Sequence, residues 1–284
     1  MPLRLIKLVI SLLVACVDWI SAAVRRLLGG QPTTECIVLY YHATQAAARR
    51  QFASQMDELV RISVPIDIEG TEPLPKGRRY SAVTFDDGFM SVVENALPEL
   101  HARKIPCTIF VPTGSIGRQP SWISPSHADA AEVVASAEVV QAIANHMLVR
   151  IGSHSVSHPN FRRLDDMQAR DELTRSKATL EEILVREVTS FSFPHGAYTQ
   201  RSLDLARQCG YTRVFTIEPA RLRDPRAGFA VGRIRVEPDD WPIEFRLKIL
   251  GAYRWMVRAS ALKRELLGIV RGGRTQLPQS QHRL

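Results

Sequence analysis

The sequence predicts an α/β fold in which parallel strands and crossover helices form either an open sheet or a closed barrel. Its 284 residues, 45% hydrophobic and 23% charged, are enough to bury one large core. Short apolar runs rich in β-branched residues alternate with longer stretches of helical periodicity. Such continuous apolar runs are typical of parallel strands, which are buried on both faces. No internal repeat interrupts this alternation.

The predicted elements follow one another as strand, helix, strand. Strands are expected at residues 36–41, 80–85, 107–111, 148–153, 188–193, 212–217 and 229–236. Helical periodicity between them predicts helices near residues 48–62, 91–104, 129–146, 166–186 and 200–209. This succession indicates repeated β-α-β units, with the last strand followed by a long amphipathic segment from about residue 242.

The N-terminal 30 residues predict an amphipathic helix. Its polar residues recur at spacings of three, four or seven and share one side, namely Arg4, Lys7, Ser11, Asp18, Ser21 and Arg25. The run without a charged residue, residues 8–17, is shorter than the ~20 residues that cross a bilayer. We therefore expect a peripheral membrane anchor that lies in the interface. The alternatives are a signal peptide cut after Ala23 and a helix packed on the domain.

The net charge of +8 comes from the two ends of the chain. Residues 1–30 carry four Lys or Arg against one Asp, and residues 244–284 carry nine against two Glu, so the body between has a slight acidic excess. This pattern argues against nucleic acid as a partner and favours an anionic membrane surface. We expect an anchor helix at 1–30, a main domain at 31–241, and a basic amphipathic helix with a polar tail at 242–284.

Titratable side chains follow four of the predicted strands and are expected to meet, because carboxyl ends of parallel strands share one face of a barrel. They are His42, the pair Asp86 and Asp87, the pair His154 and His158, and His195. One carboxylate with two imidazoles four residues apart can bind a borderline divalent metal, and a second carboxylate can accept a proton from water. The four cysteines are far apart and indicate neither a disulfide framework nor a cysteine zinc site.

The segments "TFDDG" (84–88), "SHSVSH" (153–158) and "FPHGAY" (193–198) resemble the first three motifs of the polysaccharide deacetylases, the NodB-homology or family 4 carbohydrate esterases. The resemblance covers residues 35–236 and implies an irregular (β/α) barrel that removes acetyl groups from N-acetylated sugars with zinc or a similar divalent ion. It implies that Asp86 is the general base and that Asp87, His154 and His158 hold the metal.

The sequence departs from the family pattern in its later motifs. Ser192 stands where the third motif usually begins with an arginine, and "EPDDW" (237–241) only approximates the fourth motif. The late Leu-x-His motif that usually supplies the general acid is not found, but "LYYHAT" (39–44) resembles a permuted branch with a Tyr-His pair after the first strand. His42 is therefore the predicted acid and His195 its rival. The resemblance implies a substrate groove lined by Pro194, His195, Tyr198 and Trp241.

These observations predict a metal-dependent N-deacetylase that acts on an N-acetylhexosamine unit of a surface polysaccharide or its lipid-linked precursor. The altered third and fourth motifs leave a catalytically silent sugar-binding relative as the alternative. A metal phosphoesterase would need further Asp or His ligands for a second ion, and none is evident in the sequence.

Overall fold

The structure, a computed structural model, describes residues 2–71, 73–224 and 228–259. Its centre is a parallel sheet in which the strand order is β8-β7-β6-β5-β4-β3-β1-β9, with β2 paired beside β3. The strands are β1 (Glu35–Tyr41), β2 (Val64–Pro65), β3 (Arg79–Phe85), β4 (Cys107–Val111), β5 (Val149–Ser153), β6 (Ser190–Ser192), β7 (Arg213–Thr216), β8 (Ala230–Gly232) and β9 (Ile234–Arg235).

One short segment, residues 230–235, brings the two edges of this sheet together. Its first half, β8, pairs with β7, and its second half, β9, pairs with β1 at the other end of the strand order. A single residue, Arg233, separates the two halves. The sheet is therefore a nearly closed barrel, which the strand pattern left as one of two alternatives and the family resemblance implied. The expected single strand at 229–236 is split because its halves pair with opposite edges.

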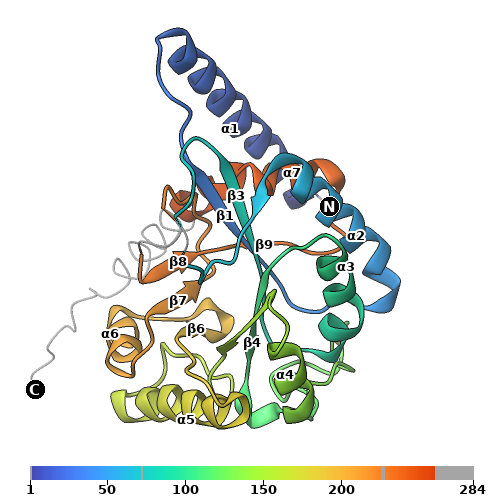
Figure 1. The fold of residues 1–284 in the computed structure, drawn as a ribbon, viewed down its shortest axis with the longest axis vertical. Coiled ribbons are helices and arrows are strands. Elements are labelled where there is room, and N and C mark those ends of the chain that lie inside the picture. The colour runs from blue at the N-terminus through green and yellow to red at the C-terminus, as the bar shows by residue number, and fades with distance from the viewer. Residues whose placement is uncertain (1, 72, 225–227, 260–284) are drawn as a thin grey trace, which may run out of the picture.

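Helices surround the barrel (Figure 1). They are α1 (Pro2–Leu27), α2 (Arg49–Ile62), α3 (Leu97–Ala102), α4 (Ala137–Ala144), α5 (Asp166–Leu184), α6 (Gln200–Gln208) and α7 (Pro242–Ile249). Capping boxes in the sequence set where two of these helices begin. Asp165 and Gln168 form one at α5, and Thr199 and Ser202 form one at α6. In the view of Figure 1, α2 to α6 follow the outside of the barrel, while α1 stands out beside α7.

Alternation along the strands sorts the core into two clusters. Ile37, Leu39, Val83 and Phe85 pack outward in the cluster that includes α2 and α3. Cys36, Val38, Tyr80 and Ala82 belong to the other cluster, together with Phe110, Phe215 and Val231. The period of two that turns Tyr80 and Ala82 to the second cluster continues through Thr84 to Asp86. The sequence therefore aims Asp86 toward the barrel interior.

Two further predicted elements differ from those observed. The helix expected at 129–146 begins only at Ala137, where Ser136 caps it with a hydrogen bond from the backbone N–H of Val139, and residues 112–136 are mostly loop. The C-terminal segment is not one long helix from residue 242. It breaks at Gly251, whose φ of 69° is left-handed, and α7 is buried between α1 and α2 with Phe245, Leu247 and Ile249 inside. Residues 260–284 of this segment lie outside the described part of the chain.

Helix α1 docks on the domain through its polar side. Arg4, Ser11 and Asp18, spaced seven residues apart, all contact the domain: Arg4 Nε lies 2.8 Å from Glu244, Ser11 accepts a hydrogen bond from Trp255, and Asp18 pairs with Arg254. Leu8 packs beside them against Leu247, Ala252 and Tyr253. The expected polar stripe is thus real, and its residues Arg4, Ser11 and Asp18 face the protein, while Ser21 and Arg25 are exposed.

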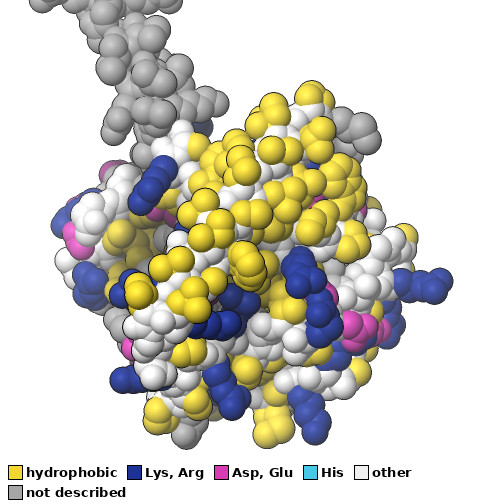
Figure 2. Space-filling view, turned by 90° about the horizontal axis from the view of Figure 1, so that it is seen from above, with side chains coloured by type: hydrophobic (Ala, Val, Ile, Leu, Met, Phe, Trp, Pro, Cys, Tyr) yellow, Lys and Arg dark blue, Asp and Glu magenta, His cyan; other side chains and the backbone are white. Residues whose placement is uncertain are grey.

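The opposite side of α1 is apolar and exposed. Figure 2 shows hydrophobic side chains gathered on the face that carries this helix, with lysines and arginines nearby. The exposed large side chains of α1 are Leu3, Leu5, Ile6, Val9, Leu12, Leu13, Val17, Trp19, Ile20, Val24 and Leu27. At 26 residues, or about 39 Å, α1 is long and apolar enough to cross a membrane. Length and composition alone fit a membrane helix, a signal sequence and a packed helix alike.

Candidate active site

Three predicted metal ligands meet at the carboxyl end of the barrel strands. Asp87 follows β3, and His154 and His158 follow β5; their ligand atoms lie within 4.8 Å of one another, and all three residues are buried. Asp87 Oδ1 is 3.2 Å from His158 Nε2 and 3.6 Å from His154 Nε2. These contacts lack hydrogen-bond geometry, so within the described part of the chain Oδ1 is a buried acceptor without a donor. Such an atom beside two imidazoles fits a divalent cation.

Backbone conformation and a neighbouring carbonyl aim these side chains. The carbonyl oxygen of Ser192 lies 2.8 Å from His154 Nδ1, so Nδ1 donates to it and Nε2 is left to face Asp87. Asp87 and His158 adopt left-handed backbone conformations with φ of 68° and 57°, which are uncommon for non-glycine residues. Gly88 follows in the same conformation, and a Cβ there would lie 3.1 Å from Val111.

The first aspartate of the pair, Asp86, is held by a buried arginine. Arg233 is fully buried between β8 and β9, and its two terminal nitrogens each donate to one Asp86 oxygen at 2.8 Å. The same guanidinium also donates to Ser192 Oγ at 2.8 Å and to Thr84 Oγ1 at 3.1 Å. Ser192, which replaces the expected arginine of the third motif, is therefore a partner of an arginine supplied from the junction between β8 and β9.

Burial and charge oppose each other in setting the pKa values here. Burial would raise the pKa of Asp86, but the Arg233 guanidinium and then His154 outweigh it and hold that pKa well below its usual range. Burial also acts to raise the pKa of Asp87, and contact with His158 and His154 lowers it overall. Burial lowers the pKa of His154 to about 4 despite attraction by Asp86. Two carboxylates and a neutral His154 are the forms needed to bind a cation and to accept a proton.

The predicted acid candidates line the same cavity, which has a volume of about 400 Å³. Its walls include His42 after β1, His195 after β6 and Trp122 from the loop after β4. Trp122 stacks on the His158 ring at 4.2 Å, while His195 meets the same ring edge-on at 4.5 Å. The structure thus brings six predicted site residues together around one cavity: His42, Asp86, Asp87, His154, His158 and His195.

The other predicted groove residues are not among those that line this cavity. Pro194 is buried, and Tyr198 packs on Phe193 at 5.5 Å. Trp241 lies at the start of α7, where the guanidinium of Arg4 from α1 sits 4.6 Å from the centre of its ring. In this structure Trp241 therefore helps to seat α1, away from the metal-ligand cluster.

Comparison with known proteins agrees with these motifs and this fold. A family model described as polysaccharide deacetylase matches residues 74–214, which include Asp86, Asp87, His154 and His158. Residues 74–214 of this chain form a domain of the polysaccharide deacetylase family. A curated relative, YxkH from Bacillus subtilis (strain 168), is 28% identical over 156 residues. That match covers 55% of this chain, and the chain spans about half the length (51%) of the relative.

Solved structures share the deacetylase barrel. IcaB from Ammonifex degensii matches with a TM-score of 0.64 and 27% identity, covering 77% of this chain and 98% of that one. The deacetylase PplD from Streptococcus pyogenes, solved in complex with acetate, matches with a TM-score of 0.62 and 17% identity, covering 76% and 99%. At that identity the likeness to PplD concerns the fold alone. Resemblance to the family, inferred from three short motifs, is thus confirmed.

Sequence reasoning missed two residues of this site, Arg233 and Trp122. Arg233 could have been found as a charge inside the apolar run "FAVGRIRV", because a buried arginine requires a buried carboxylate. Trp122 could have been suspected because it lies in a long loop after a strand, where deacetylase-like barrels collect functional residues. Neither shares a motif with the ligands, so only the fold places them there.

The Arg233–Asp86 pair should appear as a strong coupling in stability. Arg233→Met should lower the free energy of unfolding by about 3–5 kcal/mol, because it leaves a buried carboxylate without its partner. The double variant Arg233→Met with Asp86→Asn should recover most of that loss. Denaturant unfolding of the metal-free proteins measures both. Additive losses in the double variant would show that the two groups do not depend on each other.

Metal binding should depend on each of the three clustered ligands. His154→Ala, His158→Ala and Asp87→Asn should each abolish tight zinc binding, because two ligands hold the ion far less well than three. Equilibrium dialysis with metal analysis measures the stoichiometry. His146→Ala, which removes an exposed histidine elsewhere, should bind zinc as the wild type does. A wild-type protein that takes up no stoichiometric zinc, cobalt or nickel would contradict the assignment.

Proposed function

We propose that this chain hydrolyses the acetyl amide of an N-acetylhexosamine unit with the help of a divalent metal, most readily zinc. The observation that supports this is the pairing of a three-ligand cluster, whose buried Asp87 Oδ1 has no donor in the described residues, with a second carboxylate held by Arg233. Asp87, His154 and His158 would hold the ion, which would supply Lewis-acid catalysis at the acetyl carbonyl.

The chain's own groups can carry the proton transfers. Asp86, kept ionised by Arg233, accepts a proton from the attacking water, and the carbonyl carbon gains the water oxygen. His42, which lines the same cavity, donates a proton to the nitrogen as the C–N bond breaks, so that acetate and the free amine leave.

The proposed substrate is an N-acetylated sugar of a surface polysaccharide or of its lipid-linked precursor, met at a membrane. The family supports the polysaccharide class, and the exposed apolar side of α1 supports the membrane location. A catalytically silent sugar-binding relative is disfavoured because Asp86, its arginine and the three ligands are all in place. A two-metal phosphoesterase is disfavoured because, of the residues that the structure describes, only one group has the spacing of metal ligands.

Zinc-loaded protein should release acetate from chitooligosaccharides or another member of a panel of N-acetylated glycans. Asp86→Asn should keep its zinc and lower kcat by at least about 10², because it removes the general base. Enzymatic assay of acetate, with metal analysis of the same samples, measures both. Sugar binding without acetate release from any member of the panel would favour the silent relative.

His42 and His195 should give different kinetic phenotypes. His42→Asn should lower kcat by about 10² and leave zinc content and substrate binding nearly unchanged, because it removes the proton donor alone. His195→Asn should mainly raise KM, because His195 lies on the groove wall against His158. Steady-state kinetics on one soluble substrate distinguishes them. The reverse pair of phenotypes would place the acid after β6.

Membrane attachment should depend on the outward side of α1. Replacing Leu13, Val17 and Trp19 by Ser should move the protein from vesicle pellets to the supernatant, since apolar burial drives attachment. High salt should release the wild type only in part. Replacing Met147, Met167 and Val185, which are as exposed but lie elsewhere, is the matched control and should not change sedimentation. Equal pelleting of both triple variants with phosphatidylglycerol vesicles would exclude α1 as the anchor.

A further inference from the structure

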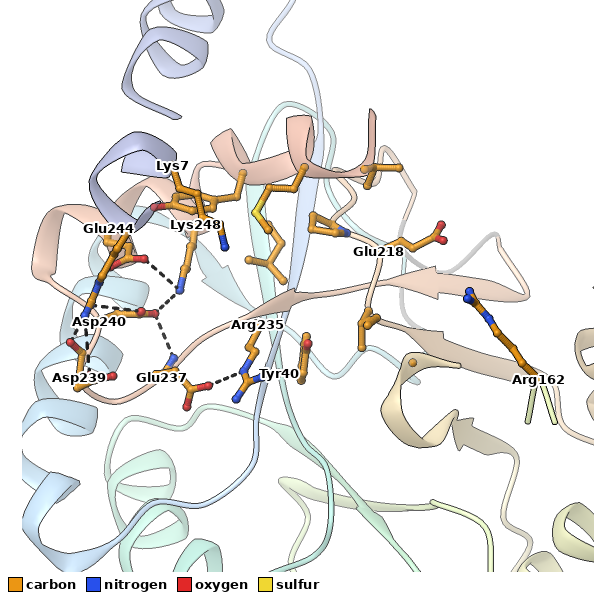
Figure 3. A pocket seen from close by; sticks show the side chains of 18 residues that line it. Lys7, Tyr40, Arg162, Glu218, Arg235, Glu237, Asp239, Asp240, Glu244 and Lys248 are labelled. Carbon is orange, nitrogen blue, oxygen red and sulfur yellow. Dashed lines mark hydrogen bonds and ion pairs between the residues drawn. The ribbon is translucent and has the colours of Figure 1, made fainter. Parts of the chain in front are cut away.

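A second cavity, of about 570 Å³, adjoins the metal-ligand cavity at the rim of the barrel (Figure 3). Four residues line both cavities: Tyr40, Gly196, Ile217 and Arg235. Burial raises the pKa of Tyr40 to about 12, so this shared wall presents a neutral phenol. A molecule whose sugar lies over the metal ligands can therefore continue past Tyr40 and Ile217 into the second cavity.

The second cavity has an apolar lining and a polar rim whose charges largely neutralise one another. The apolar side chains are Ile217, Pro219, Ile234, Tyr253, Met256 and Val257. Around them Arg4 pairs with Glu244, Lys248 pairs with Asp240, and Arg235 pairs with Glu237. Figure 3 shows Lys7 reaching toward the cavity from α1. Paired charges of this kind do not favour a polyanion, and they leave an apolar surface available for contact.

The far side of this cavity lies under α1. Arg4 and Lys7 of α1 form part of its wall, as do Met256 and Val257 of the segment that follows α7. The other side of α1 carries the exposed apolar side chains, including Leu5, Ile6 and Val9 within the same two turns. A substrate that runs from the metal ligands through the second cavity thus ends beside the exposed apolar side chains of α1.

We propose that the second cavity is a subsite for an apolar group attached to the N-acetylated sugar, so that the preferred substrates are lipid-linked saccharides and not free polymer. This inference rests on the proposed deacetylase activity and extends it. The sugar lies over Asp87, His154 and His158. The first part of the lipid contacts Ile217, Met256 and Val257, and the remainder continues beneath α1 toward the membrane.

The test compares the methyl and dodecyl glycosides of diacetylchitobiose below the critical micelle concentration of the latter. The dodecyl glycoside should have a kcat/KM at least about tenfold higher, since burying two methylene groups is enough for that factor. It should also bind at least about tenfold more tightly to zinc-loaded Asp86→Asn, measured by calorimetry, which needs no turnover. Equal values for the two glycosides in both measurements overturn the subsite.

Variants test whether the alkyl chain binds in the second cavity or on the exposed apolar side of α1. Ile217→Asp and Val257→Asp, on two different walls, should each reduce the preference to less than about threefold, because a carboxylate would have to be buried against the alkyl chain. Leu13→Ser, on the outward side of α1, should keep the tenfold preference. Loss of preference in Leu13→Ser, or its survival in both cavity variants, assigns alkyl binding to the surface and overturns the proposal.

Acetate release from the methyl glycoside without any gain for the dodecyl glycoside refutes the subsite alone, whereas failure to release acetate from any N-acetylated glycan refutes the proposed activity.

Discussion

The pairing of Arg233 with Asp86 joins the closure of this barrel to its chemistry. Arg233 stands between two short strands that pair with opposite edges of the sheet, so its backbone completes the barrel. Its side chain points to the carboxylate that follows β3 and donates two hydrogen bonds to it. A buried guanidinium and a buried carboxylate are each costly alone and tolerable together. The closure of the barrel by β8 and β9 and the position of the Asp86 carboxylate therefore depend on the same contact.

The fold was largely predictable because its signals are local. Apolar runs at 36–41, 80–85 and 107–111 match β1, β3 and β4 within one residue, since each strand is buried on both faces and reads as a continuous apolar run. The pairing of β8 and β9, which closes the barrel, was not predictable in the same way. Which edge each half of residues 229–236 would join depends on the closure of the whole sheet. The start of α4 was also misjudged, because apolar residues at 133–135 extend the helical period while their backbone pairs with the loop after β3.

The site was predictable where residues adjoin in sequence. "DDG" and "HxxxH" carry the predicted metal ligands in two short segments, which follow β3 and β5, the two strands on either side of β4. The partner of Asp86 was missed because it lies 147 residues away. In the resemblance an arginine was expected at position 192, yet Ser192 accepts a hydrogen bond from Arg233, so the serine and the displaced arginine form one arrangement. Trp241 stands at a position that resembles the fourth motif, but its side chain packs against Arg4 of α1.

The heptad contacts of α1 also fix how the helix is turned about its own axis. Arg4, Ser11 and Asp18 are each tied to a partner on the domain, so the helix can neither roll nor slide without breaking several of these contacts together. Any surface that the outward side of α1 contacts is therefore held at a fixed distance and tilt relative to the candidate active site. For the deacetylation proposed above, the helix would act as a spacer that selects acetyl groups by their distance from that surface, so geometry would limit which units of a glycan reach the site.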